Sequence, residues 1–579
     1  MSGNGNGCGL EARAPSNGVT RREMTWVLLW AAFVMLLTCI PYVYALQRAE
    51  GRLFGGFVWG VDEGNVYLTW MRQAAEGDLF FRNQYSTAPE HPRFFNLFLQ
   101  VGGRTGGLLH VDMRVMFHVL RLLGGMFLLV SLYVLVAELT ADKVARWAAL
   151  SLASLGSGLG WLIVLVVPQT GLHPVDVGQA WQTQPEAVTF LSLLLNGLFT
   201  TSMALMCLTF LFALRALRGD RKAIWWGGLC LLVLGNVHTY DVFAVWLALA
   251  VTAGWRDGGM ARWRDGVKRL APIIAIGLPS VAWSLYATFS DPSFLAKGLT
   301  PTPAFRFVDY VVAYGLIGVL AVLGAVRLSR IPNPESRIPA FWALANALVL
   351  LIPVSFQRKM IEGLHLPLCI LAGFAVSWIA TAITRRLRER GKLKHAMERV
   401  VLTVCAVVVL CVPSNALFVS QCLESVKTNN AELLRVLQPP IYLDAGDAAA
   451  MRWLAHNSGR DDVILSSSLM GSYLPTYCPA KVWIGHWAET LHFQEHLAAL
   501  EPVYAPVPAD TLLSEVRDMG GTMVYYGPYE QGLTKSTSTL LEAPSDYVPR
   551  WLTSAGEALT QVYDEQDVRI YRVPPVNTR

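Results

Sequence analysis

Long apolar segments constrain this chain more than any other feature of its sequence. Hydrophobic residues make up 53% of the 579 residues and charged residues only 15%, whereas soluble domains are about one quarter charged. A helix of about 20 apolar residues is long enough to cross a bilayer. A window of that length finds about eleven segments, at roughly 25–46, 114–137, 146–167, 187–214, 223–237, 240–254, 270–289, 308–326, 338–355, 364–384 and 399–420. The sequence therefore predicts an α-helical polytopic membrane protein with about eleven transmembrane helices.

The fifth and sixth segments are shorter than the others, and Asn236–Asp241 lies between them. Neither is long enough for a full span. We expect a shallow hairpin or a pair of broken helices, with its apex at membrane depth.

Basic residues gather in every second loop between the apolar segments, for example Arg21 and Arg22, 215–222, 256–269 and 385–399. The positive-inside rule makes these loops cytoplasmic. The N-terminus is then inside, while the long loop 47–113 and the C-terminal part are outside. The 385–399 cluster also suits contact with anionic membrane lipids. The net charge of only +5 argues against a nucleic-acid partner.

These patterns predict that the chain is divided into three regions. Residues 1–23 are rich in Gly, Asn and Ser and read as a disordered cytoplasmic tail. Residues 24–422 form the transmembrane domain, and residues 423–579 a small extracytoplasmic α/β domain in a multi-pass plasma membrane protein. In that last part we expect helices at 447–456, 489–500 and 511–519 and strands at 463–466, 523–526 and 568–573.

Two adjacent carboxylates, Asp62 and Glu63, follow the first apolar segment in the long outer loop. The apolar residues after them predict an amphipathic helix that lies on the membrane surface and ends near Gly77. A carboxylate held there could accept a proton from a hydroxyl group. Alternatively, the pair is a charge favoured at a helix N-terminus by the helix dipole.

The Asp62-Glu63 pair, followed by Tyr67, Met71 and Gly77, resembles the first outer loop of the GT-C superfamily of membrane glycosyltransferases. Protein O-mannosyltransferases and the aminoarabinose transferases that modify lipid A belong to this superfamily. The likeness extends to the number of spans, the short mid-chain helices and the C-terminal outer domain. It implies an inverting transfer of a sugar from a polyprenyl-phosphate carrier to an acceptor outside the membrane. It also implies that 24–422 is the catalytic domain, with Asp62 as base and Glu63 as its support.

A departing lipid phosphate needs positive charge at the outer membrane boundary. Arg358 and Lys359 end the ninth apolar segment, Arg121 is a charge inside the second, and His238 lies at the hairpin apex. All four are candidates for binding the donor phosphate. Arg358 and Lys359 could instead be interfacial cations whose apolar stems are buried, and His238 could simply pair with Asp241.

The second outer loop adds Asp176 and Glu186, which could position the acceptor or hold a divalent metal ion together with Asp62. No spacing typical of metal ligands accompanies them, and the resemblance leaves metal dependence open. We therefore assign no metal ligand from the sequence.

Other patterns support competing hypotheses. His492-Phe-Gln-Glu-His496 matches the inverted zinc-protease motif, but the motif has only three fixed residues and a surface helix with polar His and Glu explains it better. The glycine pairs at 102–103 and 106–107 predict turns. A transporter or flippase of a lipid-linked substrate would also use intramembrane Arg and His, although the acidic pair lies in an outer loop. A polysaccharide polymerase or ligase is a further alternative.

Overall fold

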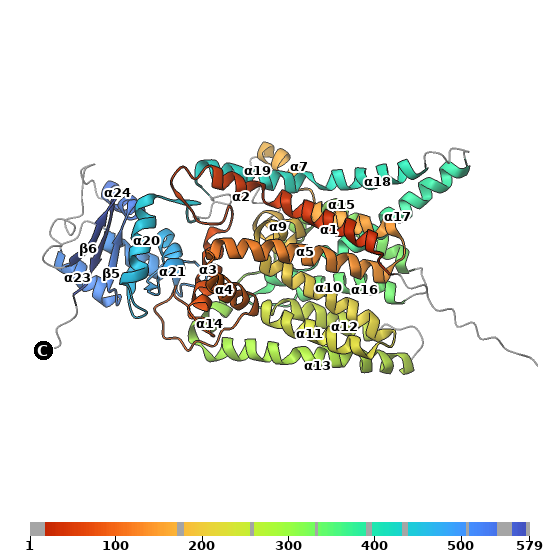
Figure 1. Cartoon of the computed structure of the whole chain (residues 1–579), viewed down its shortest axis with the longest axis horizontal. Helices are drawn as coiled ribbons and strands as arrows, with labels where there is room; N and C mark the ends of the chain where they lie inside the picture. The colour runs from red at the N-terminus through yellow and green to blue at the C-terminus, as the bar shows by residue number, and fades with distance from the viewer. Residues whose placement is uncertain are drawn as a thin grey trace, which may run out of the picture.

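The computed structural model describes residues 18–170, 179–254, 260–329, 334–389, 396–430, 438–504, 509–540 and 559–574. The protein is elongated, with a helical bundle at one end and a small sheet with its own helices at the other (Figure 1). Between them lie α3 (Val61–Ala75), α4 (Leu97–Leu109) and α14 (Pro292–Leu299).

The bundle is formed by the apolar segments of the sequence. Its helices are α1 (Arg21–Thr38), α2 (Ile40–Gln47), α5 (Met113–Leu139), α6 (Lys143–Leu155), α7 (Gly160–Val166), α8 (Gln179–Thr183), α9 (Thr189–Leu195), α10 (Gly197–Leu217), α11 (Arg221–Val237), α12 (Asp241–Gly254), α13 (Met260–Ser290), α15 (Phe307–Ser329), α16 (Ile338–Val349), α17 (His365–Glu389), α18 (Ala396–Cys411) and α19 (Pro413–Thr428). Side chains cap several of them at the first turn. Asp112, Asn196 and Asp220 accept hydrogen bonds from backbone N–H groups two residues further on.

All eleven predicted segments are helical, but they are not equally able to span a membrane. Among the described residues, six helices are long and apolar enough, and eight if two bent pairs, α6–α7 and α18–α19, each count as one span. The other three segments, α11, α12 and α16, have only 17, 14 and 12 residues. The predicted hairpin is present, because α11 and α12 meet at 238–240. Its apex packs against α4, where the Asn96 amide donates to the carbonyl of Val237.

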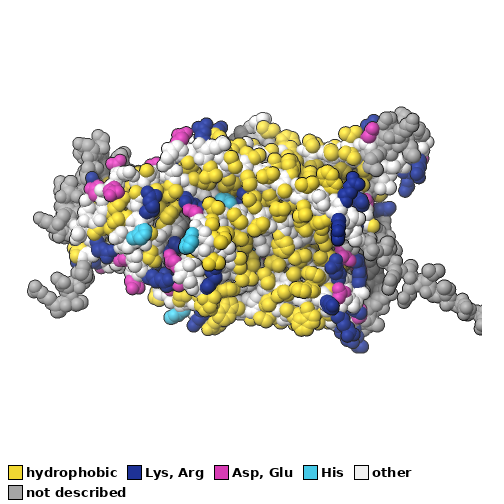
Figure 2. All heavy atoms as spheres, in the orientation of Figure 1, with side chains coloured by type: hydrophobic (Ala, Val, Ile, Leu, Met, Phe, Trp, Pro, Cys, Tyr) yellow, Lys and Arg dark blue, Asp and Glu magenta, His cyan; other side chains and the backbone are white. Residues whose placement is uncertain are grey.

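The surface of the bundle divides into an apolar belt and a charged edge. Figure 2 shows hydrophobic side chains over the middle of the molecule and Lys and Arg side chains gathered at one edge. Leu36 of α1, Val322 of α15 and Leu410 of α18 are more than 60% exposed, as expected for side chains that face lipid. At the charged edge Glu138 of α5 pairs with Arg215 and Arg218 of α10. We call this the basic end and the opposite one the sheet end.

The C-terminal part is an α/β structure around a five-stranded mixed sheet of order β4-β3-β5-β7-β6. Its strands are β3 (Val463–Leu465), β4 (Lys481–Val482), β5 (Met523–Tyr526), β6 (Thr560–Glu565) and β7 (Val568–Arg572). Strand β3 is parallel to β4 and β5, whereas β7 is antiparallel to β5 and β6. The helices are α20 (Ala445–Asn457), α21 (Ser468–Tyr477), α22 (Phe493–Tyr504), α23 (Ala509–Asp518) and α24 (Pro528–Leu540).

The C-terminal part binds tightly to the loop 47–113. The short strands β1 (Leu53–Phe54) and β2 (Tyr442–Leu443) pair with each other. Helix α21 packs on α3, where the Arg72 guanidinium donates to the carbonyl of Pro475 (3.1 Å). The Gln84 amide donates to the carbonyls of Cys478 and Ala480. The C-terminal part therefore contacts the chain before α3, in α3 itself and after it.

Three details differ from the sequence-based predictions. Helix α3 is buried on nearly all sides and does not lie on a surface, because α4, α5 and α21 enclose it. The glycine pairs at 102–103 and 106–107 lie inside α4 and are not turns. A Cβ on Gly103 would lie 2.2 Å from the carbonyl oxygen of Met71, so glycine allows α4 to approach α3 closely. The helix predicted from 489 begins only at Phe493, because His492 has a left-handed backbone (φ 52°).

Candidate functional site

The backbone at the start of α3 fixes the position of Asp62 and Glu63. Gly60, which precedes the helix, has a left-handed conformation (φ 57°, ψ 47°) that favours glycine. The Phe57 ring folds back under the first turn, where a Cβ on Gly64 would lie 2.4 Å from it. Asp62 and Glu63 therefore stand in the first turn, among backbone N–H groups that have no partner within the helix.

Asp62 is buried, with a relative exposure of 7%. Burial raises the pKa of its carboxyl group to about 7, and the charge of Glu63 adds to the rise. Hydrogen bonds from the backbone N–H groups of Asp62 and Glu63 and from the Gln438 amide act in the opposite direction. Asp62 thus combines a favourable place at a helix N-terminus with a pKa near neutrality, as a general base requires.

His486 faces Asp62 from the loop between β4 and α22. Burial and the charges of Lys297 and Lys359 lower the pKa of His486 to about 3, so its imidazole is neutral. Its Nδ1 accepts hydrogen bonds from the backbone N–H groups of Ala488 (3.1 Å) and Glu489 (3.3 Å). The ring proton is therefore on Nε2, which lies 3.7 Å from the Asp62 carboxylate. This tautomer places an N–H group near the carboxylate but beyond hydrogen-bond distance, and Nε2 has no hydrogen-bond partner among the described residues.

Glu63 is exposed, and its charge acts on groups from distant parts of the chain. Burial raises the pKa of Glu186 to about 7, and Glu63 contributes to the rise. Glu186 lies in the short turn η3 (Pro185–Ala187), which contacts the turn η5 (Gln357–Ile361). Lys359 of η5 lies within electrostatic range of both Glu63 and Glu186. We call Asp62, Glu63, Glu186 and Lys359 the α3 cluster.

The two cations of η5 have different surroundings. The Lys359 ammonium lies 5.5 Å from the centre of the Tyr240 ring and forms no ion pair with the described residues. The Arg358 guanidinium lies 5.7 Å from the Phe305 ring centre. Its Nε is buried and has no hydrogen-bond partner among the described residues. Both groups can still bind an anion.

Arg121 is 1% exposed and bound by neighbouring protein groups. It donates to Thr38 Oγ1 (2.8 Å), the carbonyl of Leu193 (2.9 Å) and His118 Nδ1 (3.2 Å), and its guanidinium lies over the Tyr42 ring. These contacts place it within the packing of α1, α5 and α9. Asp176 lies outside the described residues.

His238 contacts two buried carboxylates. Its Nδ1 lies 3.1 Å from Asp241, as expected from the sequence, and 3.2 Å from Glu362. Among the described residues, these three form the one group of His, Cys, Asp and Glu side chains with a geometry that could hold a metal ion. Asp62 and Glu186 are not part of it.

The histidines of the inverted zinc-protease motif, His492 and His496, do not have a geometry that could hold a metal ion. The His496 ring stacks on Trp483, with ring centres 4.1 Å apart, and its Nδ1 donates to the Trp483 carbonyl. His492 is exposed and lies 3.5 Å from Glu495. The two histidines therefore do not share a metal position.

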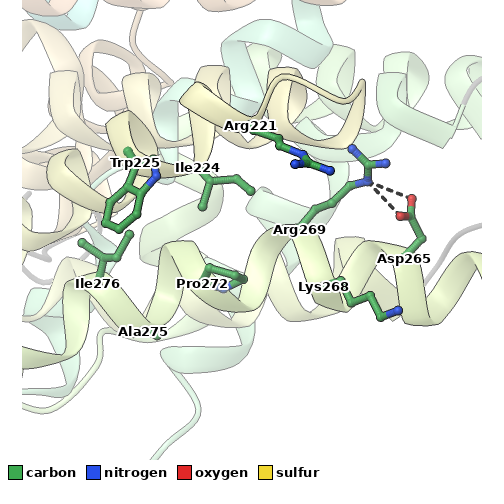
Figure 3. Close-up of a pocket in the computed structure, with 9 residues that line it drawn as sticks. All are labelled: Arg221, Ile224, Trp225, Asp265, Lys268, Arg269, Pro272, Ala275 and Ile276. Atoms are coloured by element: carbon green, nitrogen blue, oxygen red, sulfur yellow. Dashed lines mark hydrogen bonds and ion pairs between the residues drawn. The ribbon is translucent and has the colours of Figure 1, made fainter.

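A groove at the basic end is lined by both basic and apolar side chains. It lies between α11 and α13 and combines the basic side chains of Arg221, Lys268 and Arg269 with apolar ones such as Trp225 (Figure 3). Arg269 pairs with Asp265 in the same groove, at 2.9 Å. The groove lies at the start of α11, and His238 lies at the end of this helix.

From the sequence, His486 was expected only as a residue that could line the face of the C-terminal domain towards the membrane part, and Glu362 was not singled out. His486 is more than 400 residues from Asp62, and no local pattern connects the two positions. Glu362 stands just before the apolar segment 364–384, and an acidic residue at such a boundary was the available signal.

The comparisons with known proteins agree with this architecture. No protein-family model and no curated protein sequence matches the chain. Its structure is similar to the archaeal oligosaccharyltransferase AglB from Archaeoglobus fulgidus, in complex with an inhibitory peptide and a dolichol-phosphate. The TM-score is 0.51 at 11% identity, over 95% of this chain and 75% of AglB.

It is also similar to the arabinofuranosyltransferase AftD from Mycobacteria, with a TM-score of 0.54 at 14% identity, over 97% of this chain but only 42% of AftD. ArnT from Cupriavidus metallidurans, bound to undecaprenyl phosphate, gives 0.48 at 14% identity, over 93% of this chain and 97% of ArnT. The first two similarities show that this chain shares the fold of AglB and AftD, in agreement with the GT-C fold expected from the resemblance of the first outer loop.

Proposed function

We propose that this protein is an inverting glycosyltransferase that moves a sugar from a polyprenyl-phosphate carrier to an acceptor outside the membrane. The main support is Asp62, a carboxylate with a pKa near neutrality at a helix N-terminus in a GT-C fold. Its neighbour Glu63 lies within electrostatic range of Lys359 of η5. AglB with its dolichol-phosphate is consistent with a lipid-phosphate donor.

In the proposed reaction, Asp62 accepts the proton of the acceptor hydroxyl group while its oxygen attacks the anomeric carbon. The bond between that carbon and the phosphate oxygen breaks, and polyprenyl phosphate leaves with its negative charge. Lys359 and Arg358 stabilise this charge. Glu63 supports Asp62 because its negative charge makes Asp62 more basic, and Glu186 positions the acceptor.

His486 is a positioning residue in this proposal. Its Nε2–H group lies 3.7 Å from the Asp62 carboxylate. In the proposed reaction this group moves closer and donates a hydrogen bond that keeps the carboxylate in one orientation. Because its loop belongs to the C-terminal part, docking of that part would help to order the base. We leave Arg121 out of the proposed site, since its donors are bound to protein.

The proposed orientation follows the distribution of charge. The basic end faces the cytoplasm together with the N-terminus, and the sheet end with Asp62 faces outwards. Residues 423–579 would then form the extracytoplasmic domain, and 24–422 the catalytic membrane domain.

The test is release of free polyprenyl phosphate. The full chain is purified in detergent and incubated with a panel of radiolabelled polyprenyl-phosphate sugars and a membrane extract as acceptor source. We expect one donor to yield both free polyprenyl phosphate and a labelled acceptor. If labelled donor crosses the membrane of reconstituted vesicles without any release of lipid phosphate, the protein is a transporter or flippase instead.

A further inference from the structure

Three side chains, two of them buried and the third partly buried, meet at two breaks between helices near the α3 cluster. His238 ends α11, Asp241 begins α12, and Glu362 follows η5 just before α17. His238 Nδ1 lies 3.1 Å from the Asp241 carboxylate and 3.2 Å from that of Glu362. One ligand atom from each residue lies within 4.8 Å of the other two.

The polar atoms at the centre of this group lack hydrogen-bond partners among the described residues. They are His238 Nδ1, both carboxylate oxygens of Asp241 and Oε2 of Glu362. Asp241 is 1% exposed and Glu362 fully buried, so water outside the protein cannot satisfy them. Buried carboxylates without a donor are costly. A single proton shared between two of these atoms would still leave the other two without a hydrogen-bond partner.

The group has the chemistry and the spacing of a metal site. A first-row divalent cation binds imidazole nitrogen and carboxylate oxygen at about 2.0–2.2 Å, which places neighbouring ligand atoms about 3.0–3.5 Å apart. Two carboxylates would balance its charge. We propose that His238, Asp241 and Glu362 bind one first-row divalent cation, such as Zn²⁺ or Mn²⁺.

The surroundings hold these ligands in place. Ser202 Oγ donates to the other carboxylate oxygen of Glu362, and the Asn346 amide donates to the backbone carbonyl of Glu362 (3.0 Å). The His238 ring packs between Phe199 and Tyr240, with ring centres 5.7 and 5.3 Å away. Partners that orient a ligand and apolar walls around it are typical of metal sites. The assignment does not depend on the proposed sugar transfer.

The experiment measures bound metal. The full chain is purified with a tag that contains no histidine, treated with EDTA, loaded with Zn²⁺ or Mn²⁺ and freed of excess metal by gel filtration. Inductively coupled plasma mass spectrometry then gives the metal content per chain. We expect one equivalent of metal per chain in the wild type. In Glu362→Gln and Asp241→Asn the metal content should fall at least tenfold.

The matched control is His496→Gln, which changes the inverted zinc-protease motif and should keep the full equivalent. Loss of metal in this variant alone, or no stoichiometric binding by the wild type, would overturn the proposal. Because a variant could fail to fold, the wild type is also loaded with Mn²⁺ and its electron spin echo envelope recorded. Coupling to one imidazole nitrogen supports the site, and absence of nitrogen coupling contradicts it. Metal binding without any sugar transfer would refute the proposed function but leave this site intact.

Discussion

Asp62→Asn is expected to abolish sugar transfer, with a loss of about 10²–10⁴-fold in kcat, while the protein still folds and binds its lipid donor. Asparagine has nearly the same shape and can still occupy the helix N-terminus, but it cannot accept the proton of the acceptor hydroxyl group. The rate is measured as release of polyprenyl phosphate, and donor affinity separately with the purified variant. Normal turnover by Asp62→Asn would show that Asp62 is not the base.

The pH dependence of the wild type provides a second test of Asp62. The base must be ionised, and burial together with Glu63 raises its pKa to about 7. Transfer should therefore rise as the pH increases through about 7 and be lost below it. Among the described residues, the charged and titratable groups around Asp62 include Glu63 on its own helix, the neutral His486 opposite and Tyr85.

Glu63→Gln is the matched variant for this pH profile. Removal of the neighbouring negative charge lowers the pKa of Asp62, so the rising limb should move to lower pH with only a modest loss of rate. If Glu63→Gln abolishes transfer and Asp62→Asn does not, Glu63 is the base and Asp62 its support.

Lys359→Gln is expected to lower kcat by about 10²-fold and to weaken donor binding, because the departing phosphate loses a cation. Lys359 lies beside Glu63 and Glu186 and forms no ion pair with the described residues. Arg358→Gln should have a smaller effect in the same direction, since that guanidinium is directed at Phe305. Steady-state kinetics over a range of donor concentrations gives both quantities.

Lys222→Gln is the control for Lys359→Gln, because Lys222 lies in the first turn of α11, next to Arg221 of the groove at the basic end. It should change neither donor affinity nor kcat. An unchanged donor affinity in both Lys359→Gln and Arg358→Gln would exclude η5 as the phosphate site.

The fold could largely be predicted from the sequence, because its main signals are local. Every apolar segment forms a helix, and the predicted strand 523–526 coincides with β5. Strand β6 escaped prediction because exposed polar residues interrupt its apolar alternation. The number of spans was harder to predict, since α11, α12 and α16 are as apolar as the helices that are long enough to cross a membrane, but shorter.

The candidate site could be predicted only where its residues are neighbours in sequence. Asp62 and Glu63 stand together, so their unusual position was visible. His486 and Glu362 reach the site through packing between distant elements, which no local pattern encodes. Burial also changed one expectation, because α3 looked amphipathic but is enclosed by α4, α5 and α21.

The most direct test of the proposed site is the structure of the protein with bound undecaprenyl phosphate, determined by electron cryomicroscopy. We predict density for the phosphate beside Lys359 and the N-terminus of α3, at the sheet end. Phosphate density instead in the groove of Arg221, Lys268 and Arg269 at the basic end would contradict the α3 cluster as the site of sugar transfer.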